Sequence, residues 1–310
     1  MTSIQLSIVS TIYNSESTIE QFVERSEKIA RSLVADQFEI ILVDDGSSDG
    51  SLTRALSTQK VHDKIIIVQL SRNYGQHAAL LAGLRIAKGA SVACIDGDCD
   101  EDPEWIGKFW KAQNETGADL VIGSQQKIKS SMFYRASRIV FFNLLGLRGL
   151  SNSNETTARL MTRQVANALV RNKESKFYFG GSMVELGFHR IYVPVGKNKS
   201  VPTRYTFIKR VRQAITAITS FSTAPLKMLF LWGGIVSIAA STAAVVGLAL
   251  YLTGAIENGQ GWFSLFTITT FFGGNILLGL GLIGQYIATA VIESKRRPQY
   301  HIRRIHRHKQ

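Results

Sequence analysis

Polar and acidic side chains follow four short hydrophobic runs in the N-terminal part of the chain. These polar groups begin at Thr11, Asp44, Ser71 and Asp96. Asp and Ser are also common in turns and at helix N-termini, so a single group of this kind indicates little by itself. Brought to one place, the four groups would offer hydroxyl, guanidinium and carboxylate groups to a phosphorylated ligand and a metal ion.

The fourth group is an acidic run in which Asp96, Asp98 and Asp100 alternate with other residues. In an extended backbone these side chains point the same way, and three like charges in one place are costly unless a cation offsets them. Carboxylate oxygens suit Mg²⁺ or Mn²⁺, whose other positions would be filled by water and phosphate oxygens. The run therefore predicts a Mg²⁺ or Mn²⁺ site with all three aspartates as ligands.

Other uses of these residue types fit less well. An EF-hand calcium loop starting at Asp96 needs Gly at its sixth position and Glu at its twelfth, where the chain has Glu101 and Gly107. The nearby His and Cys residues do not form a zinc ligand set. The sequence contains neither a P-loop motif nor a Gly-x-Gly-x-x-Gly motif after the first run. A diphosphate would then be held mainly through the metal, which makes it a good leaving group.

The hydrophobic runs before the polar groups have the length and β-branched composition of strands. They are 6–9, 39–43, 65–70 and 92–95, and helical patterns such as 19–33 and 77–87 lie between them. This alternation predicts βαβ units and a mainly parallel sheet. Ligands of such sheets bind beyond the carboxyl ends of the strands, which is where all four polar groups fall.

Two long stretches without charged residues, 228–252 and 263–292, lie in the C-terminal third. Each exceeds the roughly 20 residues that an α-helix needs to cross a bilayer, although two buried helices of a soluble core are an alternative. A mean hydropathy of +0.06 also favours a membrane protein. Basic residues lie outside both stretches, so the positive-inside rule predicts cytoplasmic termini and a short turn at 254–261 on the far side.

The net charge of +13 comes mostly from basic residues in 204–212 and 295–309, which border the apolar stretches. Because the rest of the chain is close to neutral, we expect an anionic membrane surface as the partner and no nucleic acid. Apolar residues at helical spacing beside the first basic cluster predict an interfacial amphipathic helix, with an ordinary surface helix as the alternative. Glycines in the second apolar stretch suggest close helix packing or a homo-oligomer.

These features predict four parts: a cytoplasmic catalytic domain (1–193), interfacial helices (194–224), two transmembrane helices (225–294) and a basic cytoplasmic tail (295–310). With 45% hydrophobic and 19% charged residues, a disordered chain is excluded.

The motifs Val43–Asp49, Ser71–Gly75 and Asp96–Asp98, in this order, resemble those of the family 2 glycosyltransferases with a GT-A fold. Within that family the match is to the polyprenyl-phosphate glycosyltransferases, such as dolichol-phosphate mannose synthases and bacterial bactoprenol glucosyltransferases. The resemblance covers nearly the whole chain. It implies an α/β GT-A catalytic domain with a Rossmann-like, mainly parallel sheet, then an amphipathic helix and a two-helix transmembrane hairpin in a bacterial inner membrane.

The resemblance also implies roles for individual residues. The nucleotide-sugar would be bound by Thr11, Tyr13, Asn14, Asp44, Asp45, Arg72 and Asp96. Asp96 and Asp98 match the catalytic Asp-x-Asp that meets the metal and the diphosphate, and Asp100 stands where the family often has Gln. The acceptor phosphate would be held by Arg135, Arg138 and Arg159. Around Arg159 the family often reads Gly-Asp-Phe-Arg-Leu, and this chain lacks that acidic residue.

The expected reaction is inverting transfer of a hexose, with UDP-glucose as the leading donor, to polyprenyl (undecaprenyl) phosphate for cell-envelope glycan modification. The acceptor phosphate is largely ionised at neutral pH, so it needs little help from a general base, and no base is assigned. Two alternatives stay open. One is a membrane-tethered protein that binds nucleotide-sugar without turnover, which the altered segment before Arg159 favours. The other is a polysaccharide-synthase-type transferase, whose Gln-x-x-Arg-Trp motif is absent.

Overall fold

The structure is a computed structural model. It describes residues 4–97, 101–125, 155–171, 182–183, 186–196, 224–253, 261–295 and 298–308. The chain forms two compact units. Unit 1 comprises residues 1–136, 149–204 and 296–310, and unit 2 comprises residues 137–148 and 205–295.

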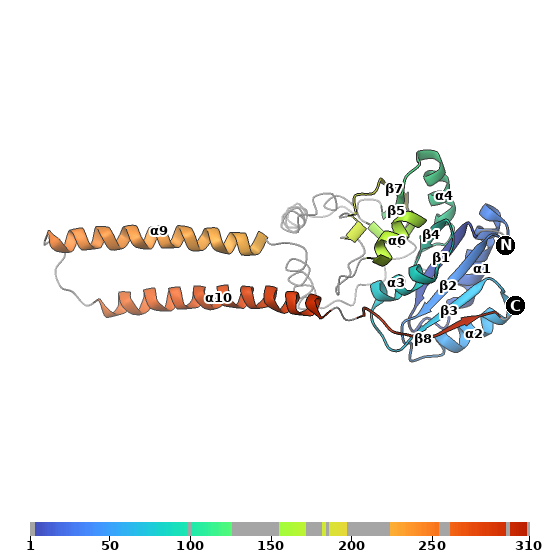
Figure 1. The fold of residues 1–310 in the computed structure, drawn as a ribbon, viewed down its shortest axis with the longest axis horizontal. Coiled ribbons are helices and arrows are strands. Elements are labelled where there is room, and N and C mark those ends of the chain that lie inside the picture. The colour runs from blue at the N-terminus through green and yellow to red at the C-terminus, as the bar shows by residue number, and fades with distance from the viewer. Residues whose placement is uncertain are drawn as a thin grey trace. The chain divides into compact units, whose positions relative to one another are not determined.

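Unit 1 is built on an eight-stranded, mostly parallel sheet (Figure 1). Its strands are β1 (Leu6–Ile12), β2 (Phe38–Asp44), β3 (Ile65–Leu70), β4 (Ser91–Cys94), β5 (Leu120–Gln125), β6 (Glu155–Thr162), β7 (Arg190–Val195) and β8 (Ile302–Arg307). The order across the sheet is β7-β5-β6-β4-β1-β2-β3-β8. Strands β1 to β4 are parallel to one another, β5 is parallel to β7, and β6 and β8 run antiparallel to their neighbours. The predicted α/β class and mainly parallel sheet are confirmed.

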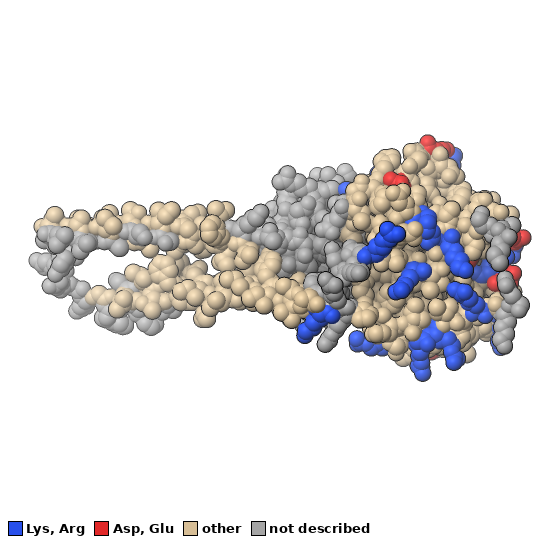
Figure 2. All heavy atoms as spheres, in the orientation of Figure 1, with Lys and Arg blue, Asp and Glu red and all other residues tan. Residues whose placement is uncertain are grey.

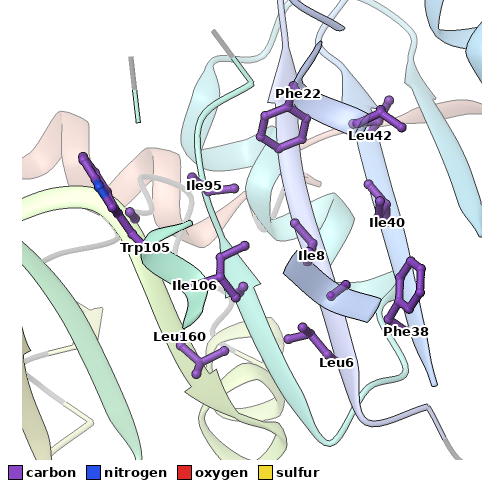
Figure 3. Close-up of a cluster of buried hydrophobic side chains, with 14 of the residues drawn as sticks. Leu6, Ile8, Phe22, Phe38, Ile40, Leu42, Ile95, Trp105, Ile106 and Leu160 are labelled. Carbon is purple, nitrogen blue, oxygen red and sulfur yellow. The ribbon is translucent and has the colours of Figure 1, made fainter. Parts of the chain in front are cut away.

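Two hydrophobic clusters cover the two faces of this sheet. Helices α1 (Ile19–Val34), α2 (Ser51–Val61) and α4 (Trp105–Thr116) contribute to one cluster, and α3 (Gln76–Ile86) and α6 (Arg163–Arg171) contribute to the other. Figure 3 shows Ile8 and Ile40 of neighbouring strands lying near Phe22 of α1 in the first cluster. All three are at most 1% exposed. Because both faces are buried, β1 and β2 are continuous apolar runs, which is why the sequence identifies them.

The C-terminal segment contains a strand that the sequence analysis did not anticipate. Residues 295–310, expected as a basic tail, include β8, which pairs antiparallel with β3 from Ile66↔Arg307 to Leu70↔Ile302. The strand sequence Ile-Arg-Arg-Ile-His-Arg is dominated by basic side chains, which hide the period-two pattern. Basic residues are typical of a sheet edge, where they discourage pairing with other chains. Unit 1 therefore takes residues from both sides of unit 2 in the sequence.

Unit 2 contains the two long apolar helices, α9 (Ala224–Leu252) and α10 (Trp262–Ser294). Among the described residues, one segment, Phe271–Ile292, is long and apolar enough to cross a membrane, and a shorter apolar stretch covers Met228–Ala240. The two helices lie side by side and, on the face drawn in Figure 2, show no charged side chains apart from their ends. Helical structure at both predicted positions is confirmed, while the two-span hairpin stays a prediction. Most of the predicted interfacial helices lie outside the described residues.

Candidate active site

The polar groups of the first four strands meet at a cavity of about 320 Å³ at the carboxyl edge of the sheet. Its lining residues are Thr11, Tyr13, Ser15, Asp45, Asn73, Gly75, Gln76, Asp96 and Gly97. Four predicted donor-site residues are among them, namely Thr11, Tyr13, Asp45 and Asp96. The other five were missed because each stands next to a more conspicuous charged or aromatic residue in the sequence. The expectation that the strand ends come together is therefore met in unit 1.

Asn14 joins the loop after β1 to the loop after β2. Its side-chain Oδ1 accepts a hydrogen bond from the Ser48 backbone N–H at 3.0 Å, and its own backbone N–H donates to Ser47 Oγ at 3.2 Å. Asn14 has a positive φ of 52°, a conformation that Asn tolerates better than most residues. In this structure Asn14 shapes the loops beside the cavity and does not line it, so its predicted contact with the nucleotide stays a prediction.

Two buried carboxylates end β2. Asp44, 2% exposed, accepts a hydrogen bond from the Ser47 N–H at 3.1 Å and so closes the turn. Asp45, 3% exposed, accepts from the N–H groups of Tyr74 at 2.7 Å and Gly75 at 2.9 Å. Burial raises the pKa of Asp45, the charge of Asp44 acts in the same direction, and the two N–H donors oppose the shift. Asp45 thus fixes the loop that follows β3.

A glycine lets the loops after β2 and β3 touch. Gly46 has φ +71°, and a Cβ atom there would lie 2.6 Å from both the Arg72 carbonyl carbon and the Asn73 nitrogen. Both neighbours are backbone atoms, so a side chain at Gly46 would push the two loops apart. The Gly in the Asp-Asp-Gly-Ser motif is therefore required by close backbone approach.

Residues Ser71–Gly75 form the β3 loop. Within it, the Arg72 guanidinium lies 4.6 Å from the centroid of the Tyr74 ring, and Ser71 Oγ is 2.9 Å from the Tyr74 hydroxyl. Hydrogen bonds to Ser71 and Arg72 lower the pKa of Tyr74. Arg72 is exposed beside the cavity, next to its lining residue Asn73. This position is compatible with the predicted contact between Arg72 and a nucleotide, which stays a prediction.

The carboxylate of Asp96 stands just after β4 and lines the cavity. The Gln76 side-chain amide donates to Asp96 Oδ1, and the Asp96 backbone N–H donates to Glu101 Oε2 at 3.2 Å. Within the residues that the structure describes, no cluster of three His, Cys, Asp or Glu side chains could hold a metal. Asp98 and Asp100 lie outside the described residues, so the three-carboxylate metal site stays a prediction.

Glu101 is a site residue that the sequence analysis used only to reject a calcium loop. It is 9% exposed, and its Oε1 accepts from the backbone N–H groups of Thr157 at 2.8 Å and Ala158 at 3.1 Å on β6. Burial raises its pKa, and hydrogen bonds from three backbone N–H groups oppose that shift. Glu101 therefore links the backbone of Asp96, at the start of the acidic run, to the backbone of β6.

The predicted acceptor arginines fall into two groups. Arg135 and Arg138 lie outside the described residues. Arg159 is 6% exposed and donates to the carbonyl oxygens of Thr156 at 2.8 Å and Thr157 at 2.9 Å, and to Met183 Sδ at 3.1 Å. Its guanidinium is thus engaged by protein atoms in this structure. Binding of an acceptor phosphate by the three arginines stays a prediction.

Comparison with known proteins adds the following findings. Residues 7–180 match the sequence profile of glycosyl transferase family 2. A Mycobacterium tuberculosis protein named as a putative glycosyltransferase is 34% identical, with 97% of this chain and 88% of the relative covered. The undecaprenyl-phosphate 4-deoxy-4-formamido-L-arabinose transferase of Yersinia enterocolitica is 31% identical, with 97% and 93% covered. The crystal structure of mannosyl-3-phosphoglycerate synthase from Rubrobacter xylanophilus has a TM-score of 0.50 at 15% identity, with 70% and 73% covered, and shares the fold.

Proposed function

The chain belongs to glycosyl transferase family 2 and is a glycosyltransferase with a GT-A-like fold, and on this basis we propose that it transfers a hexose from a nucleoside-diphosphate sugar to polyprenyl phosphate. The observation that carries the proposal is the cavity in which Thr11, Asp45 and Asp96 come together at the carboxyl edge of the sheet. UDP-glucose is the leading donor and undecaprenyl phosphate the leading acceptor. The Yersinia relative, whose name states an undecaprenyl-phosphate acceptor, supports the acceptor class.

The walls of the cavity suit a nucleotide-sugar. Tyr13 is 50% exposed and offers one ring face on which a base can stack, while Thr11 supplies a hydroxyl for the ribose or a phosphate. Asp45 keeps the part of the wall formed by the β3 loop in place through its hydrogen bonds to Tyr74 and Gly75. A wall fixed before the ligand arrives lowers the ordering cost of binding.

The acidic run is suited to a divalent ion. Asp96 with Asp98 and Asp100 would hold Mg²⁺ or Mn²⁺, since hard oxygen donors match either ion. Such an ion supplies charge that offsets the negative charge growing on the departing diphosphate. The Asp96 carboxylate is held by Gln76 and its backbone by Glu101, so its orientation is set before any ion binds.

The acceptor phosphate oxygen would attack the anomeric carbon opposite the leaving nucleotide, which inverts the configuration. With a second pKa near 6, a phosphate monoester is already largely ionised at neutral pH. Arg135 and Arg138 would hold this phosphate through bidentate hydrogen bonds. Arg159, buried and bonded to backbone oxygens, would contribute mainly by shaping the segment around it.

Unit 2 would hold the enzyme at the membrane that contains its acceptor. Phe230 is 81% exposed and Leu277 is 71% exposed, and burying side chains of this size in an apolar medium contributes about 1.5–3 kcal/mol each. Strands on both sides of α9 and α10 in the sequence belong to one sheet. If the chain crosses a bilayer between them, it must do so an even number of times, which supports a two-helix hairpin with the segments before and after it on the same side. Homo-oligomerisation through these helices stays a prediction.

The test is a transfer assay on the detergent-solubilised full-length chain with undecaprenyl phosphate and Mg²⁺ or Mn²⁺. UDP-glucose, UDP-GlcNAc, UDP-galactose and GDP-mannose are compared, with nucleotide release and product mass both scored. We expect release that requires lipid and metal together, and a product carrying one sugar per lipid. Binding of a nucleotide-sugar without lipid-dependent release would favour the tethered binding protein instead, and a product with many sugars would favour a polysaccharide synthase.

A further inference from the structure

The segment Tyr300–Ile302, which leads into β8, lies against the β3 loop in unit 1, and we term it the return segment because it brings the chain back from α10. We infer that the return segment is part of the donor site, with His301 acting as a positioning residue for Tyr74 and thereby for the β3 loop. The inference rests on the proposed function for the identity of the ligand, a nucleoside diphosphate. It assigns a role in donor binding to His301, a residue of the segment that the sequence predicted to be a basic tail.

His301 contacts the β3 loop through its backbone and its ring. Its carbonyl oxygen accepts a hydrogen bond from the Ser71 N–H at 2.9 Å, which extends the β3–β8 pairing into the loop. Its imidazole ring lies 6.2 Å from the Tyr74 ring, centroid to centroid, at an interplanar angle of 54°. The Tyr74 hydroxyl also interacts with the backbone of His301. A tilted aromatic pair of this kind is a favourable geometry.

Tyr74 connects these contacts to the cavity. Its backbone N–H donates to Asp45 Oδ1 at 2.7 Å, and the neighbouring Gly75 N–H donates to Asp45 Oδ2 at 2.9 Å. Asn73 and Gly75, on either side of Tyr74, both line the cavity together with Asp45. A change in the position of Tyr74 therefore moves the cavity wall.

Apart from its contacts with Asp45 and Gly46, the β3 loop packs on the rest of unit 1 mainly through Tyr74. Ser71, Arg72 and Asn73 are exposed, and a Cβ atom added to Gly75, at φ +92°, would meet no atom within 4 Å. By contrast, Tyr74, Tyr300 and Ile302 pack together against the buried cluster under α3 and α6. An exposed loop that is ordered only on ligand binding weakens affinity through the entropy lost. Packing of the return segment against Tyr74 orders the β3 loop before the ligand binds, and so reduces this loss of entropy on binding.

The experiment compares three variants of the full-length chain in detergent. His301→Ala removes the ring, His301→Phe keeps a ring without ionisable nitrogens, and Arg303→Ala is the matched control, an exposed residue of β8 two positions after His301. UDP and GDP, each with Mn²⁺, are the binding probes for isothermal titration calorimetry. Transfer kinetics give the KM values of donor and acceptor and kcat, and thermal unfolding reports on the fold.

For His301→Ala we expect the nucleotide Kd and the donor KM to rise together by about two- to tenfold, the range of one aromatic pair. We expect kcat, acceptor KM and the melting temperature to stay near wild type, because His301 is exposed and makes its sheet contact through the backbone. His301→Phe should restore nucleotide binding, and Arg303→Ala should behave as wild type. If His301→Ala only damaged the fold, kcat and the melting temperature would fall as well. In that case His301→Phe would not restore the donor KM selectively.

Three results overturn the inference: wild-type nucleotide affinity in His301→Ala, failure of His301→Phe to restore it, or equal weakening by Arg303→Ala. If the wild type binds UDP or GDP but transfers no sugar, the proposed function fails while the binding comparison still decides the role of His301. If the wild type binds neither nucleotide, both the proposed function and the inference fail.

Discussion

The carboxyl edge of the sheet in unit 1 and the helices of unit 2 are organised by different physical principles. At the sheet edge, buried carboxylates such as Asp45 and Glu101 each accept hydrogen bonds from at least two backbone N–H groups. Along α9 and α10, large apolar side chains such as Phe230 and Leu277 are exposed, and the sequence has no charged residue in 228–252 or 263–292. The sheet edge therefore depends on the exact positions of hydrogen-bonding groups, whereas the helices depend on the apolar character of their side chains.

This difference predicts which properties each region controls. A hydrogen-bonded polar site loses function when one group changes, because its partners are left unpaired. A helix surface that faces lipid, as we propose for unit 2, would tolerate many apolar replacements but few charges, since a charge opposes its transfer into lipid. Substitutions at the sheet edge should therefore alter donor chemistry and leave membrane attachment unchanged, and substitutions on the helices should do the reverse.

The largest expected effect at the sheet edge comes from Asp96→Asn. The substitution removes one carboxylate that would hold the metal ion, and the weaker offset of charge on the leaving diphosphate should lower kcat by about 10²–10³-fold. Membrane retention, measured by flotation of the expressed protein, should equal that of the wild type. Asp36→Asn is the matched control, an exposed aspartate at the amino-terminal side of β2. Near-wild-type turnover in Asp96→Asn would contradict the assignment of the acidic run.

The converse substitution is Leu277→Arg, at a side chain that is 71% exposed on α10. An arginine at the centre of a spanning helix costs about 2.5–3.5 kcal/mol on insertion scales. The fraction of protein in the membrane should fall, while nucleotide binding by the solubilised chain should stay unchanged. Leu277→Phe should insert normally. Equal insertion of the arginine variant would argue that α10 does not span a bilayer.

Substitution of Glu101 tests how much the sheet edge depends on the hydrogen bonds that this side chain accepts. Glu101→Ala leaves the N–H groups of Asp96, Thr157 and Ala158 without their acceptor, and leaving such groups unpaired costs about 1–3 kcal/mol. We expect the melting temperature to fall by several degrees and donor turnover to fall with it. The exposed neighbour Glu104 provides the control Glu104→Gln, which should melt as the wild type does. A fully stable Glu101→Ala would show that these hydrogen bonds do not support the acidic run.

The smallest expected effect is a pH dependence from Asp45. Because burial raises its pKa above the ordinary 3.8, the folded state holds this proton more tightly than the unfolded state. The contribution of Asp45 to stability is therefore complete below 3.8 and declines as the pH rises through the raised pKa. The margin by which the wild type melts above Asp45→Asn should shrink as the pH rises through the pKa of Asp45. A margin that grows with pH would mean that folding lowers this pKa.

Much of unit 1 was predictable because its strands are continuous apolar runs with helices between them. The lining residues Thr11, Asp45 and Asp96 follow from one rule, that parallel strands bring their carboxyl ends to the same edge. The two apolar helices were predictable from length and composition alone. In each case the signal lies within a contiguous stretch of the sequence.

The remaining features depend on partners that are distant in sequence or invisible in it. β8 is a basic hexapeptide whose strand character comes from pairing with β3, more than two hundred residues earlier. Glu101 binds backbone N–H groups of β6, which no side-chain pattern reveals. Arg159 has the residue type suited to a phosphate, yet the fold buries it against carbonyl oxygens.

The most direct test of the account is a structure of the full-length chain with UDP and Mn²⁺, in which anomalous scattering locates the ion. The account predicts an ion peak at the carboxylate of Asp96, in contact with the diphosphate, and the nucleoside between Tyr13 and Asp45. An ion or a diphosphate bound away from the end of β4 would contradict it.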